Sequence, residues 1–157
     1  MSFRIKEILT IACLLAFILF INHRESYIDV SVQDIYEQVC DDMDMTDMSE
    51  FGYAEIKKNF GFNINDYGTA VYYGHETVMR SECLFVLKLN DENMGASIVD
   101  TIDGKRTELA ELFKSYAIDQ YELLSNSVLV QKGEYIIYVV SEDADDVYKE
   151  FLKVITG

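Results

Sequence analysis

The chain has 157 residues, a net charge of −15 and three cysteines. A length of this order is typical of one domain, which needs no disulfide or metal to fold. Half of the residues are hydrophobic, and this composition excludes a disordered chain. An acidic surface repels phosphate backbones, so we expect no nucleic-acid partner.

The N-terminal segment, residues 1–25, contains an uncharged apolar run. Residues 8–21 read ILTIACLLAFILFI, and Arg4 and Lys6 precede them. As a helix this run rises about 21 Å, against a hydrocarbon core of about 30 Å, so its length fits either a short anchor or a signal-peptide core. The small residues of a cleavage site do not follow it. We therefore expect an uncleaved transmembrane anchor rather than a cleaved signal or a buried helix.

The charges around this segment predict its orientation. Arg4, Lys6 and the amino terminus favour the cytoplasmic side, although Arg24 weakens the asymmetry. We expect a single-pass protein with its N-terminus in the cytoplasm and residues 26–157 outside the cell. Without residues 1–25, ten Lys and Arg residues stand against 26 Asp and Glu residues, a net charge of −16.

The extracytoplasmic part begins with two helical patterns. Ser31 is placed to cap a helix over 32–42, where apolar residues recur at helical spacing. The acidic, Met-rich residues 41–50 predict a loop. A second, short helix is expected over 52–60, because a glycine follows it.

Two strand patterns and a long helical pattern come next. Residues 67–73 and 82–89 are rich in aromatic and β-branched residues and predict two strands. Apolar residues at helical spacing then predict a helix over 92–116. Gly104 interrupts this helix, and a bend is expected there.

The C-terminal part contains the clearest hairpin pattern. Strands are expected over 128–130 and 134–140, joined by a turn with Lys132 and Gly133, and Ser141 is placed to cap a final helix. The order of elements is then α, α, β, β, α, β, β, α. This order predicts an α+β fold, with an antiparallel sheet of about four strands in two hairpins and helices packed mainly on one face.

This pattern resembles the bacterial domain-of-unknown-function family forty-three fifty-eight. The resemblance rests on the helix VQDIYEQV, the strand ECLFVLKL, the hairpin VLVQKGEYIIYVVS and the helix YKEFLKVI, and it covers nearly all of residues 30–157. It implies a small anchored or secreted extracytoplasmic protein of low-GC Gram-positive bacteria, and no known reaction. The chain departs from the lipoproteins of that family, because Cys13 lies in the middle of its apolar run.

Few residues of the chain could form a catalytic site. His23 and His75 are its two histidines, and it has no HExxH, GxSxG or phosphate-binding glycine motif. We therefore predict no catalytic residue and no cofactor. The leading hypothesis is a non-enzymatic binding module of the cell envelope. The alternatives are an envelope hydrolase or transferase that uses carboxylates which the sequence does not place, and a weakly Ca²⁺-responsive domain.

Three groups of residues are candidates for a site. Tyrosines on an open sheet face could bind a peptide or glycan of another envelope protein or wall component, although tyrosine is also common strand material. Aspartates in the 41–50 loop could bind Ca²⁺ weakly, although they lack the glycine and glutamate of an EF-hand. Two cysteines could form a disulfide or stay as buried thiols. The candidate tyrosines are Tyr67, Tyr72, Tyr73, Tyr135 and Tyr138. The candidate Ca²⁺ ligands are Asp41, Asp42, Asp44 and Asp47, and the candidate disulfide partners are Cys40 and Cys83.

Alternation along the expected strand 134–140 separates two of these tyrosines. Tyr135 and Ile137 should share one face of the sheet, and Ile136 and Tyr138 should share the other. If helices cover one face alone, tyrosines line the open face and are free to bind a partner.

Overall fold

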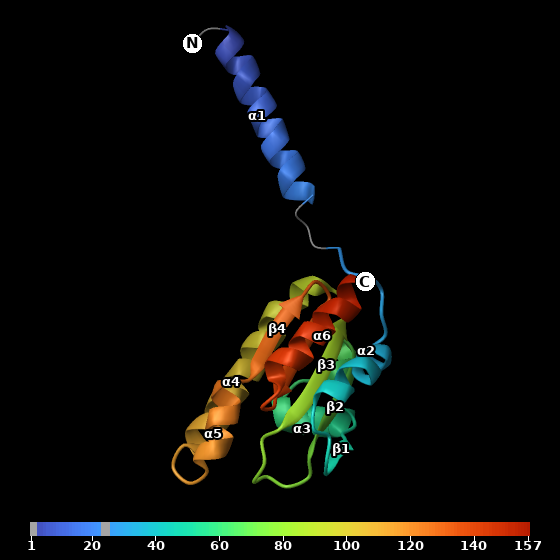
Figure 1. Cartoon of the computed structure of the whole chain (residues 1–157), viewed down its shortest axis with the longest axis vertical. Helices are drawn as coiled ribbons and strands as arrows, with labels where there is room; N and C mark the ends of the chain where they lie inside the picture. The colour runs from blue at the N-terminus through green and yellow to red at the C-terminus, as the bar shows by residue number, and fades with distance from the viewer. Residues whose placement is uncertain (1–2, 23–25) are drawn as a thin grey trace.

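The computed structural model describes residues 3–22 and 26–157 (Figure 1). Arg24 and the predicted end of the anchor at residue 25 lie outside the described residues. The described part contains six α-helices, three 3-10 helices (η) and five strands. In chain order they are α1 (Phe3–Asn22), α2 (Val32–Val39), η1 (Cys40–Asp42), β1 (Met48–Glu50), α3 (Tyr53–Phe60), η2 (Ile64–Asp66), β2 (Gly68–His75), β3 (Cys83–Leu89), η3 (Glu92–Met94), α4 (Gly95–Phe113), α5 (Ile118–Ser125), β4 (Val128–Lys132), β5 (Tyr135–Val140) and α6 (Ala144–Thr156).

The N-terminal helix α1 is apolar, and its described side chains are exposed. Seven large apolar side chains between residues 8 and 18 are each at least half exposed. Among the described residues, no helix is both long enough and apolar enough to cross a membrane. Membrane anchoring by residues 1–25 stays a prediction.

The five described strands form one antiparallel sheet in the order β1-β2-β3-β5-β4. Both predicted hairpins, β2–β3 and β4–β5, are confirmed, and β3 pairs with β5 to join them. The predicted number of strands is one too low, because Met48–Glu50 pairs with the end of β2 instead of lying in a loop. Three residues are too few to show the alternation from which strands are predicted.

Helices cover both faces of the sheet, so the prediction of helices mainly on one face is wrong. α3, α4 and α5 pack on the face that carries Phe85 and Leu87, whereas α2 and α6 pack on the face that carries Leu84 and Val86. A continuous apolar run is typical of a strand buried on both sides, and ECLFVLKL is such a run. The open, tyrosine-lined face that we expected is therefore absent from the described part of the molecule.

The helix expected over 92–116 is divided in the structure. The 3-10 turn η3 precedes α4, and α4 ends at Phe113. α4 continues without a break through Gly104, which faces solvent and has no neighbouring atom close to it. α5 then follows as a separate helix that the sequence did not predict. It buries two side chains, Gln120 and Leu124, so its apolar pattern is weak.

Two serines lie at the starts of helices. Ser31 caps α2 as predicted, because its Oγ accepts a hydrogen bond from the backbone N–H of Asp34 at 3.1 Å. The predicted cap of the final helix at Ser141 is wrong, since α6 begins at Ala144 with Asp143 in the capping position. Ser141 Oγ instead accepts a hydrogen bond from the backbone N–H of Asp143 at 3.1 Å, in the turn before the helix.

The segment before α2, residues 26–31, is fastened to one end of the domain. The backbone N–H of Ile28 donates to the carbonyl oxygen of Ile155 in α6 at 2.8 Å. The hydroxyl of Tyr135 on β5 accepts a hydrogen bond from the backbone N–H of Val30 at 2.9 Å. The segment therefore lies beside the C-terminus, as Figure 1 shows, and the loop between β2 and β3 lies at the far end of the sheet.

Candidate ligand-binding pocket

A cavity of about 770 Å³ lies beside the sheet, between α3, α4 and the neighbouring ends of β2 and β3. We call it the α3–α4 pocket. Its walls come from β1 and α3, from the loop of residues 76–82 and from the second half of α4. Its volume is within the range of cavities that hold a small molecule or a peptide side chain.

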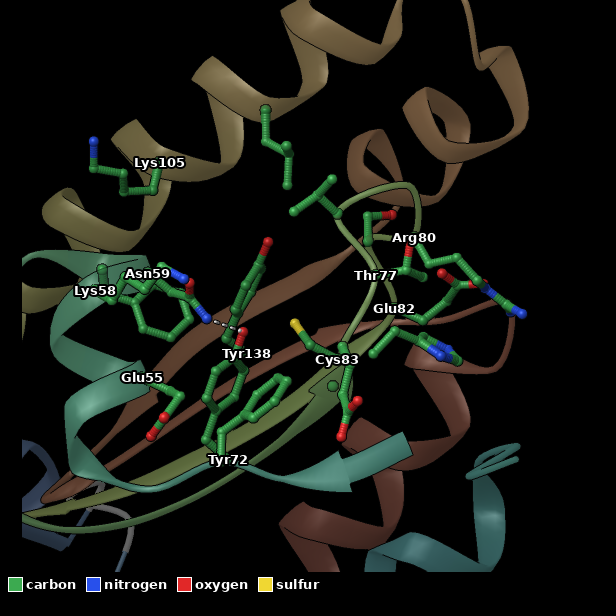
Figure 2. Close-up of a pocket in the computed structure, with 18 of the residues that line it drawn as sticks. Glu55, Lys58, Asn59, Tyr72, Thr77, Arg80, Glu82, Cys83, Lys105 and Tyr138 are labelled. Carbon is green, nitrogen blue, oxygen red and sulfur yellow. Dashed lines mark hydrogen bonds and ion pairs between the residues drawn. The ribbon is translucent and has the colours of Figure 1, made fainter. Parts of the chain in front are cut away.

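Aromatic rings form the floor of the α3–α4 pocket. Tyr72 of β2 and Tyr138 of β5 share a face of the sheet, because both pair with Phe85 of the strand between them. The ring of Phe60 on α3 packs against both, with centroids 5.2 Å from Tyr72 and 6.2 Å from Tyr138. Asn59 Nδ2 donates a hydrogen bond to the Tyr72 hydroxyl at 3.2 Å, which the dashed line in Figure 2 marks.

Burial keeps the ionisable groups of this floor neutral. Removal from water raises the pKa of the Cys83 thiol to about 12. It also raises the pKa of the Tyr72 and Tyr138 hydroxyls far above their usual value. At neutral pH Cys83 is therefore a thiol and not a nucleophilic thiolate. The floor offers ring surface and neutral hydrogen-bonding groups to a ligand.

The rim of the pocket carries ion pairs. The Arg80 guanidinium donates two hydrogen bonds to Glu82 Oε1, and Lys105 Nζ lies 2.8 Å from Glu108 Oε2 on α4. Burial acts to raise the pKa of Glu82, but hydrogen bonds from Arg80 and from its own backbone N–H hold that pKa below its usual value. Figure 2 shows Glu55 on the α3 wall and Glu82 on the opposite wall.

The loop of residues 76–82 is held in place by α5. Both the backbone N–H and the Oγ of Ser81 donate to Gln120 Oε1, at 2.7 Å and 2.9 Å. Ser81 and Gln120 are both buried. This contact fixes the position of Arg80 and Glu82, which flank Ser81 in the chain.

A second cavity of about 760 Å³ lies between this loop, α5 and the start of α6. We call it the acidic groove. It shares Arg80 and Glu82 with the α3–α4 pocket. One oxygen of Glu82, Oε2, is buried without a hydrogen-bond partner among the described residues. The charged side chains that line the groove are Arg80 and five carboxylates, Glu82, Asp119, Glu122, Glu142 and Asp145.

The five candidate tyrosines do not form one site. Tyr72 and Tyr138 line the α3–α4 pocket, whereas Tyr67 packs against the core on that side without lining the pocket. Tyr73 and Tyr135 lie on the opposite face, as alternation predicted for Tyr135. There Tyr73 stacks on a tyrosine of α2 with ring centroids 4.2 Å apart, and Tyr135 is fully buried.

The four candidate aspartates do not converge on one point. Asp41 and Asp42 lie in η1, and Asp44 Oδ1 accepts a hydrogen bond from a backbone N–H two residues further on. Asp47 lies in a turn with a φ of 60°. Within the described ranges, no three carboxylate, histidine or cysteine side chains are grouped so that they could hold a metal ion.

Cys40 and Cys83 are free thiols, and no disulfide joins them. Cys40 follows α2, which packs on one face of the sheet, whereas Cys83 belongs to the core on the other face. The sheet therefore separates the two sulfur atoms. The thiol of Cys83 is buried, whereas that of Cys40 is partly exposed.

Most of the pocket was not identified from the sequence. Phe60 comes from α3, Arg80 and Glu82 come from the 76–82 loop, and Leu112 comes from the end of α4. The apolar run of β3 could have indicated that helices cover both faces. No local pattern indicates that the 76–82 loop meets the second half of α4.

Comparison with known proteins gives a family for the chain. Residues 41–141, more than half of the chain, match the model of a family described as Domain of unknown function (DUF4358). No curated protein and no solved structure matches the chain. The matched residues include all five strands and every residue that lines the α3–α4 pocket. The chain thus belongs to the family Domain of unknown function (DUF4358), the family that its sequence pattern resembles.

Proposed function

We propose that the chain is a non-enzymatic binding module that holds part of another envelope protein in the α3–α4 pocket. The observation that carries this proposal is the aromatic floor of Tyr72, Tyr138 and Phe60 beneath a charged rim. A preformed concave cavity in which polar groups converge is a common form of a binding site. Aromatic rings also offer a large contact area at low cost in side-chain entropy.

The pKa directions in the pocket favour binding over catalysis. A nucleophilic cysteine needs a lowered thiol pKa, and the pKa of Cys83 is raised. A carboxyl group that acts as a general acid needs a raised pKa, and the pKa of Glu82 is lowered. Both directions are opposite to those that covalent or acid catalysis requires.

The proposal includes a location for the domain, namely the outer side of the cell membrane, with residues 1–25 as the anchor. The uncharged run over 8–21 and the exposed apolar side chains of α1 support this. Protease added to intact cells should then digest residues 26–157 and spare a cytoplasmic marker. Recovery of the full chain in the soluble fraction of lysed cells would contradict the anchor.

Site-specific photo-crosslinking in intact cells tests the binding role. A photoreactive amino acid replaces Val78, which lines the pocket and is 85% exposed. A matched probe replaces Lys149, an exposed residue of α6 on the opposite face of the sheet. We expect one adduct of defined mass from the probe at position 78 and none from the probe at position 149.

A second substitution shows whether the pocket itself is responsible. Leu112→Arg brings a charged side chain to the pocket wall at a position that is 58% exposed, so the fold should tolerate it. The adduct at position 78 should then fall severalfold. Equal adducts from both probes, an adduct that this substitution leaves unchanged, or turnover of a cell-wall substrate by the intact protein would each contradict the proposal.

A further inference from the structure

The α3–α4 pocket and the acidic groove meet at one loop, residues 76–82. Both cavities are lined by Arg80 and Glu82. Val78 lines the pocket, and the next residue, Met79, lines the groove; their side chains are 85% and 55% exposed. A peptide that crosses this loop would therefore contact both cavities with adjacent parts of its chain.

More apolar surface is exposed at the corner between α4 and α5. Leu112, Tyr116 and Ile118 are each more than half exposed, and Leu112 also lines the α3–α4 pocket. This corner and the 76–82 loop lie at the same end of the domain, away from α1 (Figure 1). Neighbouring exposed apolar side chains on a folded domain mark a surface that another molecule covers.

The two cavities differ in charge. At the rim of the pocket, Lys105 is paired with Glu108. In the groove, five carboxylates stand against the single guanidinium of Arg80, which is already bound to Glu82. The groove therefore presents an excess of negative charge beside an aromatic pocket, in a domain whose net charge is −16.

We propose that the segment recognised here is a basic peptide of another envelope protein. An aromatic or large aliphatic side chain of this peptide enters the α3–α4 pocket, and Lys or Arg residues next to it lie in the acidic groove. This inference rests on the proposed function and adds the chemistry of the partner. Opposite charges across an interface attract the correct partner, whereas an acidic peptide would be repelled by the groove.

Peptide selection against the intact protein tests the inference. Random peptides displayed on phage are selected on the full chain held in a lipid nanodisc. We expect the enriched peptides to carry an aromatic or large aliphatic residue within a few positions of Lys or Arg. Their affinity should fall about tenfold as the salt concentration is raised, because screening weakens attraction between exposed charges.

Two matched double variants show whether the carboxylates of the acidic groove bind the positive charges of the peptide. Glu122→Gln with Glu142→Gln neutralises two exposed carboxylates of the groove, and Asp41→Asn with Asp42→Asn neutralises two exposed carboxylates near α2. Both change the net charge equally. We expect the first pair to weaken binding of a selected peptide about tenfold and the second pair to weaken it by less than roughly twofold.

The apolar contact has its own matched pair. Leu112→Ser removes an exposed apolar group of the pocket wall, and Met94→Ser removes an exposed apolar group before α4, outside both cavities. The first substitution should weaken binding of the selected peptide, and the second should leave it unchanged. Equal effects of the two would overturn the inference.

The remaining outcomes separate this inference from the proposed function. Enrichment of acidic or uncharged peptides, equal effects of the two carboxylate variants, or no enrichment at all would overturn the inference. If the probe at Val78 still gives its adduct, the binding module stands and its partner has another chemistry. If that adduct is also absent, the proposed function fails too.

Discussion

The hydroxyl oxygen of Tyr135 lies 2.9 Å from the backbone nitrogen of Val30, although 105 positions separate them in the chain. The same hydroxyl lies 3.0 Å and 3.1 Å from the carbonyl oxygens of Ile28 and Val30, to one of which it donates. Lys88 supports this contact, because its Nζ pairs with Asp29 and lies 5.5 Å from the centre of the Tyr135 ring. These contacts fasten residues 26–31 to β3 and β5.

Tyr135→Phe removes this hydroxyl and keeps the buried ring. We expect the free energy of unfolding to fall by about 1–3 kcal/mol, because partly buried backbone groups lose their partner. Urea denaturation measures this change, and limited proteolysis should cut within residues 26–31 sooner than in the original chain. Tyr53→Phe, at an exposed position on α3, is the control. No difference between the two variants would show that the hydroxyl does not hold the segment.

Two glycine substitutions should have opposite effects on stability. A Cβ atom at Gly68 would overlap with the carbonyl oxygen of Lys88 on the neighbouring strand, and this backbone atom cannot move aside. Gly68→Ala should therefore destabilise the fold by about 3 kcal/mol. Gly104 lies exposed within α4 with open space around it, so Gly104→Ala should stabilise the fold by about 1 kcal/mol. Thermal unfolding measures the change in stability of each variant. A shift of the unfolding temperature in the same direction for both variants would contradict the prediction.

The buried groups of the pocket floor predict a loss of stability at alkaline pH. Burial raises the pKa of Cys83 from 9.0 to about 12, and it raises the pKa of Tyr72 and Tyr138 as well. The unfolded chain thus loses these protons at a lower pH than the folded chain does. Stability should be full below pH 9.0 and fall as the pH rises from there to about 12. Urea midpoints over this range measure the fall, which should begin less steeply in Cys83→Ala.

The ion pair between Arg80 and Glu82 predicts a loss of stability at acidic pH. The pKa of Glu82 is lowered in the folded chain from its ordinary value of 4.5. The contribution of the pair to stability is therefore present above pH 4.5 and is lost as the pH falls through the lowered folded pKa. Arg80→Gln should cost about 1 kcal/mol at neutral pH and less once Glu82 is protonated. The free energy of unfolding, measured at neutral pH and at a pH at which Glu82 is protonated, gives the cost of the substitution under each condition. Lys114→Gln, which removes an exposed pair with Glu111, is the control, and an equal loss at both pH values would contradict the prediction.

Local residue patterns were enough to specify most elements of this fold. Runs of aromatic and β-branched residues together with turn residues predicted both hairpins, and two-residue alternation predicted the separation of Tyr135 from Tyr138. Helical spacing together with Ser31 predicted α2. These features depend on residues a few positions apart, and so a short stretch of sequence contains them. β1 and α5 escaped prediction, because one has three residues and the other buries two side chains.

The pocket depends on how distant elements come together, and no local pattern contains that information. Tyr72 and Tyr138 share its floor because β5, and not β4, pairs with β3, which places Phe85 between them. The acidic groove exists because Gln120 of α5, a helix that the sequence did not predict, binds Ser81 and holds the 76–82 loop against α5. Strand order and helix packing follow from burial of apolar surface over the whole domain. The sequence therefore predicted the α+β class of the fold and included Tyr72 and Tyr138 among five candidate tyrosines, while long-range packing created the cavity that these two tyrosines line.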